Sequence, residues 1–297
     1  MSDHYPRLCE YKKNGHVKFR VGLSFTFYIF HPHTEVVRAV VRALETYVDA
    51  VGPQALTYYA DYEGEGQALD EAAWARARSE MLEHPAAVET LFDAGQCYRF
   101  TYSGRSLGQS PTIHRKGEVC KASFWLPTEF LEGLGPARVR ELALAVAAPL
   151  PFSSGHAGLS FNGDPWMGTK EAVREFCFRF PGIDISGELV GREQLGTLID
   201  GVHWLTFLGQ PALGALGAVE GLRAQLKSPG TTVQELEGDR AVITLGEWPE
   251  AGDTERGDTL PAYRELARVL EPWLYFEEDY GDSAFPEKHQ WERRFLD

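Results

Sequence analysis

The segment Phe152-Ser-Ser-Gly-His-Ala-Gly-Leu-Ser-Phe161 gathers serines, glycines and a histidine, the residue types of a nucleophilic active site. The serine elbow of a hydrolase has the form Gly-x-Ser-x-Gly, whereas Asn162 stands here in place of the second glycine. No spacing marks an acidic partner for His156, so a Ser-His-Asp triad is not indicated. We expect His156 to order a tight turn or to cap a helix end rather than to act as a catalytic base.

Three other histidines could bind a metal ion or transfer a proton. His31 and His33 flank a proline, and a metal site there would also need a distant acid, so we expect a surface turn. His203 lies beside Trp204 in a strand-like segment, where a hydrogen-bonded structural role is expected. The sequence therefore predicts no catalytic residue, no metal site and no cofactor.

An acidic loop is expected where Asp61, Glu63 and Glu65 surround Gly64 and Gly66. The spacing of an EF-hand and its distal glutamate are absent, so a calcium site is not indicated. Two interpretations remain open for this loop. The carboxylates either face solvent only, or they contact Lys or Arg residues of a partner.

A second acidic region, residues 247–282, contains eleven acidic and three basic residues. Within it, aromatic rings precede three consecutive acids, a composition that can anchor a protein interface and steer a basic partner. Alternatively, the rings dock into the core and the acids only face water. The predicted partner-binding residues of this region are Trp273, Tyr275, Phe276, Glu277, Glu278 and Asp279.

The overall composition is that of a globular domain, with 43% hydrophobic and 24% charged residues among 297. The 29 basic and 43 acidic residues give a formal charge of −14, which disfavours direct contact with nucleic acid or anionic membranes. A basic partner would be attracted, although solubility alone also explains the acidity. Neither a signal peptide nor a membrane-spanning stretch is evident, so the cytoplasm is the expected compartment.

Hydrophobic patterning predicts an alternation of strands and helices without a nucleotide-binding glycine motif. A polar stretch, residues 103–117, suggests an N-terminal half (1–112) and a C-terminal half (113–297) packed as one compact unit. A β-α-β-α order recurs in both halves and is consistent with an internal duplication. The first set is expected at 19–30, 34–51, 55–60 and 70–82, and the second at 120–126, 136–148, 158–161 and 169–178.

The last third continues with a strand at 202–208 and helices at 212–226 and 261–274. Between these helices, strands 232–236 and 240–245 pair across Glu237-Gly-Asp239, which requires antiparallel geometry. The predicted fold class is α+β, with mixed or antiparallel sheets covered by helices.

Three segments together resemble the TsiV-like immunity proteins of type VI secretion systems. They are Phe124-Trp-Leu-Pro-Thr-Glu-Phe130, Phe152–Phe161 and Gly201-Val-His-Trp-Leu-Thr-Phe-Leu-Gly209, and the likeness extends from about Val21 to Leu274. The resemblance implies an immunity protein that binds a cognate secreted effector, with nuclease toxins the favoured class, and neutralises it stoichiometrically. It transfers no site residue. The alternatives are a hydrolase-like enzyme using His156 or His203 with a carboxylate, and a structural or regulatory adaptor.

Overall fold

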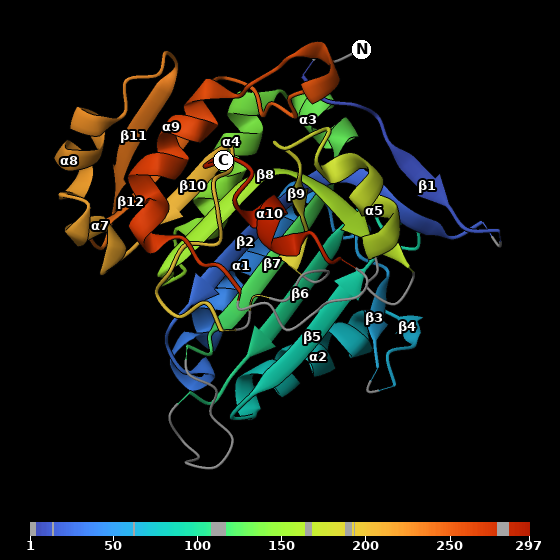
Figure 1. Cartoon of the computed structure of the whole chain (residues 1–297). Coiled ribbons are helices and arrows are strands. Elements are labelled where there is room, and N and C mark those ends of the chain that lie inside the picture. The colour runs from blue at the N-terminus through green and yellow to red at the C-terminus, as the bar shows by residue number, and fades with distance from the viewer. Residues whose placement is uncertain are drawn as a thin grey trace.

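A computed structural model describes residues 4–13, 15–61, 63–107, 117–163, 168–187, 192, 194–277 and 285–297. Within these residues, one twelve-stranded sheet forms the centre of the molecule (Figure 1). Its strands are β1 (Cys9–Tyr11), β2 (Val17–Ile29), β3 (Tyr58–Ala60), β4 (Gly66–Ala68), β5 (Ala87–Phe92), β6 (Arg99–Gly104), β7 (Cys120–Pro127), β8 (Ser154–Gly163), β9 (Asp184–Ile185), β10 (Leu205–Leu208), β11 (Thr231–Leu236) and β12 (Arg240–Leu245).

The order across the sheet is β11-β12-β10-β8-β2-β7-β6-β5-β3-β4, with β1 beside β2 and β9 beside β8. The neighbours in this order are antiparallel, and only the short β9 runs parallel to its partner β8. The long strand β2 lies between β7 and β8 and pairs with both over most of its length. The expected α+β class with antiparallel or mixed sheets is therefore confirmed.

Helices cover both faces of the sheet, with α2 behind β5 and α10 in front of the central strands in the view of Figure 1. Among the described residues, no helix combines the length and apolarity needed to cross a membrane. The α-helices are α1 (His33–Val51), α2 (Glu71–Glu83), α3 (Thr128–Leu134), α4 (Pro136–Ala147), α5 (Thr169–Cys177), α7 (Ala212–Ala215), α8 (Ala218–Gln225), α9 (Pro261–Leu270) and α10 (Lys288–Glu292), and the 3₁₀ turns are η2 (Thr254–Arg256) and η3 (Glu271–Trp273).

The helix ends follow local chemistry. Asp70 caps α2 by accepting the backbone N–H of Ala73 at 2.8 Å, so this helix begins where the sequence predicts. The helix expected at 212–226 is broken into α7 and α8 at Gly217, whose φ is +84°. The helix expected at 261–274 ends at Leu270 and continues as η3.

The two faces of β2 differ in chemistry because successive side chains of a strand point to opposite sides. Both faces are buried over most of the strand. The apolar face packs in the main core and carries Phe19, Val21, Leu23, Phe25, Phe27 and Ile29. The polar face carries Ser24, Thr26 and Tyr28 and is continued on the neighbouring strands by Lys121, Ser123, Ser154, His156 and Ser160.

The predicted hairpin is confirmed, since β11 and β12 pair antiparallel from Thr231↔Leu245 to Leu236↔Arg240. Gly238 and Asp239 make the turn with φ of +73° and +53°. Strands β5 and β6 were not expected; β6 ends inside the polar stretch that the sequence marked as a boundary.

The expected duplication is wrong in the form that equates the strand at 55–60 with the strand at 158–161. In the first segment, β2 and β3 are separated by three strands, β7, β6 and β5. In the second segment, β7 and β8 are separated only by β2. The two segments share an order along the chain but not a place in the sheet.

Candidate functional site

The most concentrated group of titratable side chains is buried on the polar face of the sheet. His156 occupies the centre of β8, where its backbone neighbours across the sheet are Thr26 of β2 and Thr206 of β10. The expectation of a tight turn at His156 was wrong, because β8 already begins at Ser154. His203 lies just before β10 rather than in a strand, and it approaches His156 from above this face.

The two imidazole rings are stacked, with centroids 3.8 Å apart and planes 14° from parallel. His156 is 2% exposed and His203 is 4% exposed. Burial disfavours the imidazolium, so it lowers the pKa of His156 to about 4 and that of His203 well below its ordinary value. Both rings are neutral at pH 7, and the Nε2 atom of each has no hydrogen-bond partner among the described residues.

Two aspartates complete this cluster. Oδ2 of Asp184, on β9, lies 3.5 Å from Nε2 of His156, and Oδ2 of Asp200 lies 3.9 Å from Nδ1 of the same ring. Burial, followed by repulsion from Asp200, raises the pKa of Asp184 to about 7. Burial would also raise the pKa of Asp200, but the adjacent Arg192 guanidinium outweighs it and holds that pKa below its usual value.

Arg192 connects the cluster to the C-terminal helix. Its side chain is 1% exposed, its Nε donates to Asp200, and its Nη1 donates to Glu292 of α10 at 2.7 Å. Glu277 lies 3.6 Å from the same Nη1, and the guanidinium carbon lies 5.7 Å from the centre of the Tyr275 ring. Burial in this position is tolerated because several carboxylates share one guanidinium.

The cluster resembles a catalytic His-carboxylate site in composition but not in access. A general base has to touch the proton that it removes, directly or through one water. Both imidazoles are almost fully buried, at 2% and 4% exposure. What the arrangement offers chemically is a closed set of two neutral imidazoles and two carboxylates, which are the donor types of a transition-metal site.

The other candidate histidines do not join this cluster. His33 is fully buried as the first residue of α1, so the expectation of a surface turn was wrong for it. Its Nδ1 and Nε2 lie 2.8 Å from the Tyr102 hydroxyl and from the Met81 carbonyl oxygen. His31 is exposed and lies 3.7 Å from Glu35.

The expected acidic loop joins β3 to β4. Oδ1 of Asp61 accepts the backbone N–H groups of Glu63 and Glu65 at 3.0 and 2.9 Å, and Oδ2 accepts from Gln67 at 2.9 Å. The Gln67 hydrogen bond, with those backbone groups, lowers the pKa of Asp61. Asp61 therefore shapes the turn, while Glu63 and Glu65 are exposed.

The predicted aromatic and acidic region lies next to Arg192. Trp273 and Phe276 are half-buried against the second core cluster, which includes Leu266 and Leu270, and Tyr275 packs beside Tyr28 and Leu195. Glu277 pairs with Lys288 of α10. Glu278 and Asp279 lie outside the described residues.

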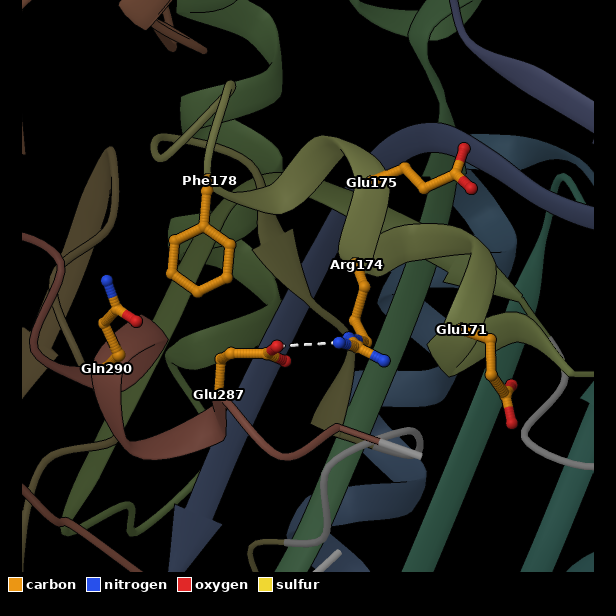
Figure 2. Close-up of a pocket in the computed structure, with 6 residues that line it drawn as sticks. All are labelled: Glu171, Arg174, Glu175, Phe178, Glu287 and Gln290. Atoms are coloured by element: carbon orange, nitrogen blue, oxygen red, sulfur yellow. Dashed lines mark hydrogen bonds and ion pairs between the residues drawn. The ribbon is translucent and has the colours of Figure 1, made fainter. Parts of the chain in front are cut away.

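An open hollow of about 510 Å³ lies between α5 and α10 and was not anticipated from the sequence. Figure 2 shows Arg174 reaching Glu287 across it, where Nη2 donates to Oε1 at 2.7 Å. Glu171, Glu175 and the ring of Phe178 line its rim. The hollow is thus mostly acidic, with one carboxylate neutralised by an internal ion pair.

Known proteins similar to this chain point to bacterial competition. A protein-family model named TsiV, described as "Type VI immunity for VRR-NUC", matches residues 39–295. The type VI secretion system (T6SS) protein PA0821 of Pseudomonas aeruginosa has a similar structure, with a TM-score of 0.77 and 22% sequence identity over 97% of this chain and 87% of that one. At this identity the structural likeness shows the fold alone. No curated protein matches the sequence significantly.

Proposed function

Because the chain belongs to the TsiV family of type VI immunity proteins, we propose that it binds a cognate VRR-NUC nuclease effector and neutralises it by stoichiometric occlusion. The observation that carries the proposal is the match of the family over residues 39–295, a range that includes the buried histidines and aspartates and the strands from β3 to β12. In this proposal the protein covers a surface of the effector and catalyses no reaction.

Charge supports a nuclease as the partner. A nuclease holds the phosphates of its substrate with basic side chains, and an acidic protein is attracted to the same surface. The chain carries a formal charge of −14. Long-range attraction raises the association rate, which favours capture of a toxin before it reaches DNA.

The burial of the histidines supports inhibition without catalysis. The sequence offers His156 and His203 as the candidates for proton transfer, and they are 2% and 4% exposed. A catalytic residue at this depth would have no contact with a macromolecular substrate such as an effector.

We propose two acidic segments as parts of the contact surface. One is the β3–β4 turn, where Asp61 holds Glu63 and Glu65 in an exposed turn at the edge of the sheet. The other is the segment from Trp273 to Asp279, whose aromatic side chains are half-buried as far as Phe276. In the second segment, the pairing of Glu277 with Lys288 assigns that residue partly to the fold.

Co-expression tests the proposal directly. Cells that produce the VRR-NUC effector should survive when they also produce this chain, and the two proteins should co-purify. The variant His156→Gln should still protect if its fold is intact by circular dichroism. A folded His156→Gln protein that binds the effector without protecting the cell would favour an enzyme instead.

Association kinetics test the second acidic segment. Replacing Glu277, Glu278 and Asp279 with their amides should slow association at low salt and leave dissociation nearly unchanged, because charge acts mainly on encounter. The amides Glu63→Gln and Glu65→Gln remove two charges from the other acidic segment and test it in the same way. Unchanged association of the triple variant across salt concentrations would remove residues 277–279 from the interface.

A further inference from the structure

We infer that His156, Asp184, Asp200 and His203 form a closed binding site for one divalent transition-metal ion, with zinc the best fit. The four side chains each offer a ligand atom, and these atoms all lie within 4.8 Å of one another. They come from β8, from β9 and from the segment that leads into β10. The inference goes beyond effector binding, because it concerns what holds the immunity protein together.

The first observation is the pair of unpartnered imidazole nitrogens. Nε2 of His156 and Nε2 of His203 are both buried without a hydrogen-bond partner among the described residues. Buried polar atoms in native proteins almost always have a partner, and an unmatched one indicates a water or an ion. Two such nitrogens on stacked rings 3.8 Å apart, beside two carboxylates, fit a shared metal ion better than two separate waters.

The second observation is the incomplete pairing of the Asp184 carboxylate, which accepts a backbone hydrogen bond from Ile185 but has no side-chain partner at hydrogen-bond distance among the described residues. Its oxygens lie 3.5 Å from His156 and 3.9 Å from Arg294, both too long for a hydrogen bond. Arg294 directs its Nε to the Pro181 carbonyl at 2.8 Å and its Nη1 to the Trp291 carbonyl at 3.1 Å. The buried carboxylate of Asp184 therefore faces the imidazoles, while Arg294 donates its hydrogen bonds to backbone carbonyls instead.

The surroundings of Asp200 provide the supporting contacts that metal ligands generally have. The Tyr28 hydroxyl donates to Oδ2 at 2.6 Å, and Arg192 donates to Oδ1. Such outer contacts orient a ligating carboxylate and leave its remaining lone pairs for the metal. Arg192 also divides its charge between Asp200 and Glu292, so it does not neutralise Asp200 alone.

The donor set and its geometry favour zinc in a structural role. Zinc binds imidazole and carboxylate at about 2.0–2.2 Å, which places tetrahedral ligand atoms roughly 3.4 Å apart. The widest pair of ligand atoms, at up to 4.8 Å, would close by roughly 1.4 Å as the stacked rings turn toward the ion. Four protein ligands leave no open position, so the ion would tie β8, β9 and residues 200–203 together rather than catalyse a reaction.

Metal binding to the untagged protein tests the inference. The protein is stripped with EDTA, dialysed, checked for folding by circular dichroism, and titrated with Zn²⁺ in competition with a chromogenic chelator. We expect one Zn²⁺ per chain and a higher melting temperature in its presence. Substituting Co²⁺ should give the intense visible absorption of a four-coordinate site.

Variants separate this site from surface binding. Asp184→Asn and His203→Gln should each weaken Zn²⁺ binding by at least about 100-fold, and Tyr28→Phe by about 10-fold. His31→Gln, which changes an exposed histidine, should bind as the wild type does. The inference is overturned if folded, stripped wild type takes up neither metal, if the Co²⁺ spectrum is that of a six-coordinate ion, or if Asp184→Asn and His203→Gln both bind unchanged. The cluster would then be an ion-pair network without a metal.

Discussion

Replacing Arg192 with methionine should destabilise the protein strongly. Methionine keeps an unbranched chain of similar length but removes the charge that Asp200 and Glu292 share. Both carboxylates would remain buried, since their side chains are 8% and 3% exposed. Removing one partner of a buried ion pair costs about 3–5 kcal/mol, a large share of the roughly 5–15 kcal/mol by which a domain is stable.

The assay is urea unfolding of wild type and Arg192→Met at pH 7.5 and pH 5.5, followed by circular dichroism. The matched control is Arg7→Met, because Arg7 is 61% exposed and pairs with Glu132 at 2.6 Å on the surface. The loss of this surface pair should cost less than about 1 kcal/mol. The same substitution thus tests a buried and an exposed ion pair.

The pH dependence gives a second check on Arg192. Without the guanidinium, burial should raise the folded-state pKa of Asp200 above its unfolded value. When the folded-state pKa of a group is raised, the protein loses stability as the pH rises through that pKa. The loss of unfolding free energy caused by Arg192→Met should therefore be smaller at pH 5.5 than at pH 7.5. A deficit below about 1 kcal/mol, or one that grows as pH falls, would refute the account of this network.

Two further changes test other parts of the fold. Gly155→Ala should destabilise the protein by about 1–3 kcal/mol, because a Cβ there would lie 2.6 Å from Cδ1 of Phe27. Gly158→Ala on the same strand is the control and should be tolerated, since its Cβ would meet nothing closer than 3.5 Å. Chemical unfolding of both variants measures the difference in stability. Burial, followed by repulsion from Glu80, raises the pKa of Glu89 to about 7. The free energy of unfolding of the wild type should therefore fall by roughly 2–3 kcal/mol as the pH rises from 4.5 to 8. Glu89→Gln should abolish that loss, and parallel pH profiles of the two proteins would contradict it.

Local chemistry made much of the fold predictable. Several local features lie where the sequence indicates. They are the helix cap at Asp70, the first helical turns at Pro136 and Pro261, and the hairpin turn at Gly238. The strands that the sequence did not predict include the neighbouring pair β5 and β6. Both strands are short, and several of their side chains are only half-buried. The second neighbour of β6 in the sheet is β7, which begins sixteen positions after β6 ends.

The buried cluster was only half visible in the sequence. The sequence offers His156 and His203 as candidates, but no spacing along the chain marks Asp184 or Asp200. Asp184 comes close to His156 only because β9 pairs with β8 in the folded sheet. One overlooked signal is the alternation in β2, where Ser24, Thr26 and Tyr28 alternate with aromatic and aliphatic residues. That period of two predicts a strand with a buried polar face, and a polar face of this kind needs charged or hydrogen-bonding groups above it.

A titration of nuclease activity shows most directly whether the protein inhibits its effector by stoichiometric occlusion. A fixed amount of the cognate VRR-NUC effector is mixed with increasing amounts of this protein, and DNA cleavage is measured at each ratio. Stoichiometric occlusion predicts that activity falls linearly and reaches zero at a small whole-number ratio of the two proteins, independent of incubation time. Progressive loss of activity at ratios far below one, continuing with time, would show that the protein acts catalytically and would contradict the account.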